Sequence, residues 1–166
     1  MNTWDRISYL LSTHQHVHEN IRFADQKALA IFVLNTSLIA GLYGIGILKP
    51  AKSGLAVFCI ITFILLAIAV LLSMAVMWPR GFEIRIKRGK GLADPLRIAL
   101  WENDEKGYIG RVSAIDDNEL IEEISYLVLD RSKINDAKYY YLRWGIGISI
   151  VAWFTSLLVI LSTTFF

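Results

Sequence analysis

The stretch "FADQKALAIFVLNTSLIAGLYGIGIL", residues 23–48, decides how this chain folds. It carries an acid and a base, Asp25 and Lys27, at its head, and no further charge occurs before Lys49. About 20 consecutive apolar residues form a helix long enough to cross the hydrocarbon core of a bilayer. We therefore predict a transmembrane helix over residues 28–48.

Two further uncharged runs have the same character and predict transmembrane helices over residues 53–78 and 144–166. The chain has 166 residues, of which 55% are hydrophobic, and its mean hydropathy is +0.47. This mean hydropathy is too high for an ordinary soluble domain. The sequence thus predicts an all-α membrane protein with three transmembrane helices.

Charge distribution predicts how the helices are oriented. All Lys and Arg residues except Lys49 and Lys52 lie in residues 1–27 or 79–143, and so do all the acids. Basic residues are retained on the cytoplasmic side of a membrane. We expect residues 1–27 and 79–143 to be cytoplasmic, residues 49–52 to form an external turn, and the C-terminus to lie outside. No secretory signal peptide is expected at the N-terminus.

The two cytoplasmic segments carry helical patterns that run into the spans. Apolar or small residues recur at spacings of 3 and 4 along residues 1–27, which predicts one amphipathic helix continuous with the first span. A similar pattern from Leu120 to Tyr141 predicts a helix of similar character, capped by Asp116 or Asp117 and continuous with the last span. Pairing of the two seams predicts a cytoplasmic helical bundle.

Residues between these helices are less regular. "FEIRIKR", residues 82–88, alternates apolar and charged side chains, which predicts a short β or extended segment. "PLRIALW", residues 95–101, is typical of a short helix.

At the head of the first span, Asp25 and Lys27 do not face each other, because positions i and i+2 of a helix point apart. Each is therefore expected to face a different neighbour, whereas Lys27 and Asn35 share one face. Two interpretations stay open. Lys27 extends to lipid phosphates and Asn35 joins two helices; alternatively, Asp25 and Lys27 couple the cytoplasmic bundle to the spans, with Asn35 near an interior path.

Residues 80–97 are strongly basic and contain Gly81, Gly89 and Gly91. One interpretation is contact with anionic lipid, since this segment follows the second span directly. The alternative is a phosphate site, because arginine forks beside bare glycine backbone suit a phosphate group. For that alternative the candidate ligand-binding residues are Arg85, Arg88 and Arg97.

Other motifs point away from catalysis. His14 and His18 share a helix face at a two-ligand metal spacing, but His16 points nearly opposite, so we expect structural histidines and no metal site. "AKYYYLRW", residues 137–144, is typical of an interfacial aromatic belt. No P-loop or nucleophile elbow is present, which predicts a protein that is not an enzyme. The overall charge balance does not favour nucleic-acid binding.

Two segments resemble the transmembrane effectors of Pycsar, the bacterial pyrimidine-cyclase system for anti-phage resistance. The Ala-Asp-x-Lys-Ala signature of that family is met by Ala24, Asp25, Lys27 and Ala28, followed by Asn35. "ISYLVLDRSKINDAKYYYLRWGIGI" is similar to the family's final helix, in which Lys138, Tyr139, Leu142 and Arg143 precede the last span. The order of elements also agrees along nearly the whole chain.

The resemblance implies a non-enzymatic effector in the bacterial inner membrane. A partner cyclase makes cCMP or cUMP on infection, and the effector then damages the membrane, which causes abortive infection. The ligand site, if it lies in this chain, is expected in residues 80–115 with the two cytoplasmic helices, across a homo-oligomer. The competing hypothesis is a small membrane scaffold with a coiled cytoplasmic stem and no ligand.

Overall fold

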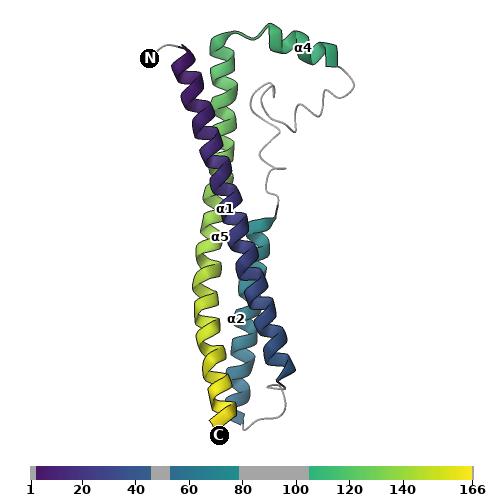
Figure 1. The fold of residues 1–166 in the computed structure, drawn as a ribbon, viewed down its shortest axis with the longest axis vertical. Coiled ribbons are helices and arrows are strands. Elements are labelled where there is room, and N and C mark those ends of the chain that lie inside the picture. Colours follow the sequence, from purple (N-terminus) through teal and green to yellow (C-terminus); the bar gives the residue numbers. More distant parts are fainter. Residues whose placement is uncertain (1–2, 46–52, 79–104, 166) are drawn as a thin grey trace. The chain divides into compact units, whose positions relative to one another are not determined.

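The structure, a computed structural model, describes residues 3–45, 53–78 and 105–165 of the chain. Within these residues the regular elements are four helices: α1 (Thr3–Gly44), α2 (Ser53–Met77), α4 (Glu105–Ser113) and α5 (Asp117–Phe165), shown in Figure 1. The all-α prediction is confirmed. The extended segment predicted at 82–88, the short helix at 95–101 and the external turn at 49–52 lie outside the described residues.

Helices α1 and α5 are each continuous, as the sequence predicts. In α1 no glycine or proline occurs before Gly41, so nothing breaks the helix where the polar segment meets the apolar run. Helix α5 begins after Asp116, whose Oδ1 accepts a hydrogen bond from the backbone N–H of Glu119 at 2.8 Å. This is an N-cap, which satisfies one of the unpaired N–H groups of the first turn.

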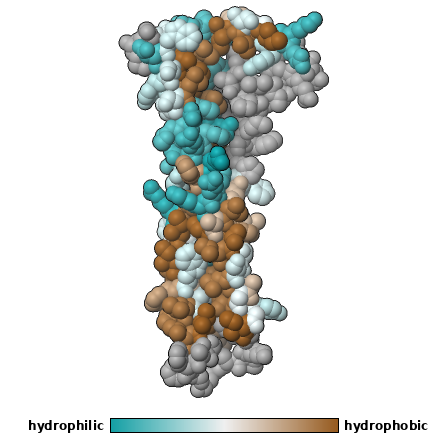
Figure 2. Space-filling model, viewed as in Figure 1, coloured by the Kyte–Doolittle hydropathy of each residue, from teal (hydrophilic) through white to brown (hydrophobic). Residues whose placement is uncertain are grey.

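Three helical segments are long and apolar enough to cross a membrane: Thr3–Gly44, Leu55–Met77 and Asp117–Ser162. Large apolar side chains along them are exposed, including Leu34, Ile64 and Phe154, each more than half exposed. Figure 2 shows such side chains gathered over the spanning helices. A continuous apolar surface of this kind is stable in lipid and not in water, so the chain is a membrane protein.

The chain divides into two compact units, which we call the polar unit (residues 1–21 and 79–136) and the spanning unit (residues 22–78 and 137–166). In the polar unit Ile7 of α1 and Ile124 of α5 are buried. Helix α4 contacts the start of α5 through an ion pair, in which Arg111 Nη2 lies 2.5 Å from Glu119 Oε1. Helices α1 and α5 contribute residues to both units.

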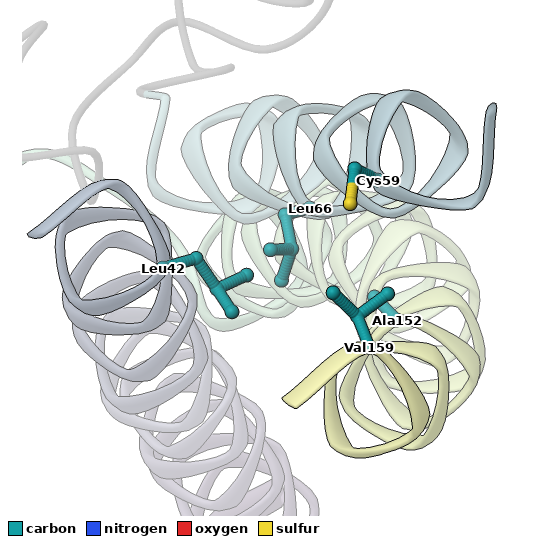
Figure 3. Close-up of a cluster of buried hydrophobic side chains, with 5 residues drawn as sticks. All are labelled: Leu42, Cys59, Leu66, Ala152 and Val159. Carbon is teal, nitrogen blue, oxygen red and sulfur yellow. The ribbon is translucent and has the colours of Figure 1, made fainter. Parts of the chain in front are cut away.

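The spanning unit has two clusters of buried apolar residues between α1, α2 and α5. The first cluster is drawn in Figure 3, where the side chains from three helices point toward one another: Leu42, Cys59, Leu66, Ala152 and Val159. The second consists of Ala24, Ala28, Ile31, Val76 and Leu142. Small residues at many of these positions let the helices approach closely, which is how helices pack in lipid.

Candidate functional site: polar links between the first and last helices

The interior of the spanning unit contains a hydrogen-bonded group centred on Asn35. Its side chain is fully buried, with an exposed fraction of 0%. Asn35 Nδ2 donates to Ser149 Oγ at 2.9 Å, and Trp153 Nε1 donates to Asn35 Oδ1 at 2.8 Å. Both oxygen and nitrogen of the amide are therefore paired with side chains of α5.

Ser149 completes this group by donating its own hydroxyl hydrogen to the carbonyl oxygen of Gly145 at 2.7 Å. The hydroxyl thus accepts from α1 and donates within α5, which fixes its rotamer. Hydrogen bonds between transmembrane helices contribute roughly 0.5–2 kcal/mol each. With two such bonds, Asn35 holds α1 and α5 together in one register.

A second link joins the same two helices at the head of the apolar run. Lys138 Nζ donates to Asp25 Oδ1, and the two groups form an ion pair. The Lys138 side chain is only 6% exposed, whereas that of Asp25 is 39% exposed. The ammonium group therefore depends on one carboxylate for its neutralisation, because a buried charge without a partner is strongly unfavourable.

Lys27, the third residue of the predicted coupling set, lies differently. Its side chain is exposed, and no ion pair to it is found among the described residues. Asp25 thus faces α5, and Lys27 faces the surroundings of the spanning unit. At this depth an exposed lysine can reach lipid headgroups. That Asp25, Lys27 and Asn35 act as coupling residues stays a prediction.

The other candidate residues fall elsewhere. Arg85, Arg88 and Arg97 lie outside the described residues. His14 and His18 stack with ring centroids 6.4 Å apart. Burial, followed by the nearby Arg131 and His18, lowers the pKa of His14. Among the described residues no group of three or more histidine, cysteine or acidic side chains is arranged to hold a metal ion.

Sequence reasoning missed the partners in both links. Lys138 lies in the predicted interfacial aromatic belt, residues 137–144, and the sequence does not single out Ser149 and Trp153 as partners of Asn35. A signal is present in the spacing, because Lys138, Gly145, Ser149 and Ala152 follow one another at intervals of 7, 4 and 3 on α5. What was lacking was the register between α1 and α5.

The comparisons with known proteins bear on the same residues. The profile of the Pycsar effector protein domain matches residues 9–166. The chain belongs to the Pycsar effector family. Among curated proteins and among solved structures no match was found. The family resemblance seen at Ala24–Asp25–Lys27–Ala28 and at the start of the last span is confirmed.

As a Pycsar effector, the protein has a role in anti-phage defence. The matched region includes both polar links, since Asp25, Asn35, Lys138 and Ser149 all lie within it. The links are hydrogen bonds and one ion pair between side chains of α1 and α5. What their arrangement can do is hold the two helices in one register.

Proposed function

We propose that this Pycsar effector permeabilises the bacterial inner membrane when a cyclic pyrimidine nucleotide, cCMP or cUMP, is made by its partner cyclase. The resulting membrane damage stops growth and causes abortive infection. In this proposal the N-terminus lies in the cytoplasm, because residues 1–27 and 79–143 contain most of the Lys and Arg residues, which are retained on that side. In this proposal the protein acts as a homo-oligomer.

The observation that carries the proposal is the pair of polar links between α1 and α5. Each of these helices runs without a break from the polar unit into the spanning unit. A displacement of the helices in the polar unit is therefore passed along the helix axes to Asp25–Lys138 and to Asn35–Ser149. The proposal requires a second arrangement of the α1–α5 joint, and a ligand favours one of the two arrangements only through different affinities for them.

In this proposal Asp25 and Lys138 are the joint at the membrane entrance, and Asn35 sets the packing that the signal disturbs. Lys27 anchors the moving end of α1 to lipid headgroups. The nucleotide phosphate is bound by Arg85, Arg88 and Arg97, whose guanidinium groups suit bidentate contacts with phosphate oxygens. The apolar outer face of the spanning unit stays in lipid in both states.

Dye release from liposomes tests the proposal. Purified protein is reconstituted into liposomes loaded with a self-quenched dye, and cCMP, cUMP, cAMP and cGMP are added separately. We expect release with one pyrimidine nucleotide and none with the purine nucleotides. Release without any nucleotide contradicts the ligand-gated function, and no release with any of them favours a scaffold or a separate sensor.

A further inference from the structure

The α2–α5 contact in the spanning unit has a regular register. Buried residues on each helix recur at spacings of 3 and 4, so each helix presents one narrow seam. On α2 the seam consists of Cys59, Thr62, Leu66, Ala69, Ser73 and Val76. On α5 it consists of Leu142, Gly145, Ser149, Ala152, Ser156 and Val159.

The two seams meet in opposite order. Val76 and Leu142 share one buried cluster, whereas Cys59 and Val159, at the other ends of the seams, share the second. Between them, a Cβ built on Gly145 lies 3.6 Å from Leu72 Cβ. Because α2 and α5 run antiparallel here, a step from Cys59 to Thr62 on α2 corresponds to a step from Val159 to Ser156 on α5. Thr62 therefore lies at the level of Ser156.

Hydroxyl groups are a recurring feature of this contact. Four seam residues carry one, and each is at most 2% exposed: Thr62, Ser73, Ser149 and Ser156. The serine hydroxyls of Ser73 and Ser156 donate to carbonyl oxygens of their own helices, at 2.9 and 2.7 Å. Thr62 Oγ1 is buried and has no hydrogen-bond partner among the described residues. The closed seam therefore leaves hydrogen-bonding capacity unused.

The same seam is held by weak forces. Both polar links described above join α1 to α5. At the six seam positions of α2, within the described residues, the one side-chain hydrogen bond is that of Ser73 to its own helix. Between helices in lipid, apolar contact carries no hydrophobic driving force. Separating α2 from α5 therefore breaks no side-chain hydrogen bond or ion pair found among the described residues, whereas separating α1 from α5 breaks both polar links.

We propose that the α2–α5 seam is the aqueous path that opens in the activated protein, with Thr62, Ser73 and Ser156 lining it. The permeants are water and small hydrophilic solutes, including the dye used to test the proposed function. Once α2 and α5 separate, hydroxyl groups turned toward lipid gain no partner, whereas those turned toward water are satisfied. The unpaired Thr62 hydroxyl marks where water first enters. This inference rests on the proposed permeabilising function.

Accessibility of introduced cysteines tests the path. In a Cys59→Ala background, Thr62→Cys, Ser156→Cys and Ile61→Cys are reconstituted into liposomes and exposed to a charged, membrane-impermeant thiosulfonate, with and without cCMP or cUMP. Ile61 is 45% exposed on the outer face of α2 and is the matched control. We expect nucleotide to raise labelling at positions 62 and 156 by about tenfold or more, and to leave position 61 unlabelled.

Dye release measured on the same liposomes separates the two claims. Release without increased labelling at positions 62 and 156 overturns the path and leaves the permeabilising function standing. No release from wild-type protein with any cyclic nucleotide overturns both. Labelling of position 61 at the same rate as position 62 also overturns the path, because the lesion then does not follow the seam.

A reversible cross-link provides a second test that does not depend on altered hydroxyls. Val159→Cys places a thiol in the same buried cluster as the natural Cys59, as Figure 3 shows for the two positions. We expect oxidation to abolish nucleotide-triggered release in proportion to the cross-linked fraction, and reductant to restore it. Val159→Cys with Cys59→Ala is the control. Undiminished release from fully cross-linked protein overturns the proposal.

Discussion

The ammonium group of Lys138 is buried against the carboxylate of Asp25, which is itself partly exposed. This asymmetry determines what each residue can tolerate. A carboxylate that loses its partner can be hydrated, whereas a buried ammonium that loses its partner cannot. The pair therefore holds α1 to α5 chiefly through the need of Lys138 for a counter-charge.

Asp25→Ala is predicted to destabilise the spanning unit by about 1–3 kcal/mol, less than for a fully buried pair because Asp25 is partly solvated. Thermal unfolding in detergent measures the change. Adding Lys138→Met to Asp25→Ala removes the unpaired charge, so the double variant is expected to unfold at a higher temperature than Asp25→Ala alone. A double variant that is less stable than either single variant contradicts this account of the pair.

Lys27→Ala is expected to leave the unfolding temperature nearly unchanged, because the Lys27 side chain is exposed. Its effect is predicted in function: the variant still reaches the membrane, but toxicity no longer follows the signal. Fractionation and phage protection measure the two properties. Asp25→Ala is predicted to lose protection as well, and wild-type protection by both variants rules out a role of Asp25 and Lys27 in coupling.

Asn35→Leu removes two interhelical hydrogen bonds and leaves Trp153 Nε1 without its partner. We expect a loss of about 1–3 kcal/mol in stability, measured by thermal unfolding in the same detergent. Ser149→Ala keeps the Asn35–Trp153 bond, so a smaller loss is expected. Leu34→Ala, on the exposed neighbouring position, is the control. Equal stability of Asn35→Leu and wild-type protein counts against the link.

Gly145 and Gly147 provide a matched pair for testing helix approach. A Cβ at Gly145 meets Leu72 Cβ at 3.6 Å, an ordinary contact, whereas a Cβ at Gly147 meets nothing within 4 Å. Gly145→Ala is therefore expected to be tolerated, and Gly145→Leu to destabilise by about 1–3 kcal/mol through overpacking. Gly147→Leu should be neutral. The unfolding temperatures of the variants measure these effects. An equal loss of stability in Gly145→Leu and Gly147→Leu contradicts the close packing at Gly145.

Protonation of His14 is predicted to weaken the polar unit. Burial and the nearby Arg131 lower the pKa of His14 in the folded protein below its ordinary value of 6.5. The unfolded chain thus binds the proton first as the pH falls, so stability decreases below about pH 6.5. The unfolding temperature measured across this range should fall less for His14→Gln than for wild type. His16→Gln, at an exposed position, should behave as wild type.

Periodic features of the sequence predicted the helices well, because each depends on local pattern. The continuity of α1, the three apolar spans and the Asp116 cap all follow from spacing and composition within one segment. The pairing of Asn35 with Ser149 and Trp153 depends on the register between helices more than 100 positions apart in the chain. That register depends on many small packing contacts between the helices, and it cannot be predicted from local patterns in a single sequence.

Lys138 illustrates the same limit. On sequence alone it stands in a basic and aromatic cluster, where an interfacial anchor is the ordinary expectation. Its burial follows from its place on the face of α5 that meets α1, one helical turn before the buried Leu142. The predicted phosphate residues Arg85, Arg88 and Arg97 lie outside the described residues, so their role stays a prediction.

We propose that a nucleotide signal reaches the membrane through the α1–α5 links. The most direct test of this proposal is nucleotide-triggered dye release from liposomes containing either wild-type protein or Asp25→Ala, with equal amounts of folded protein in the bilayer. We expect dye release from wild-type protein with cCMP or cUMP, and little or none from Asp25→Ala. Equal release from both proteins contradicts it.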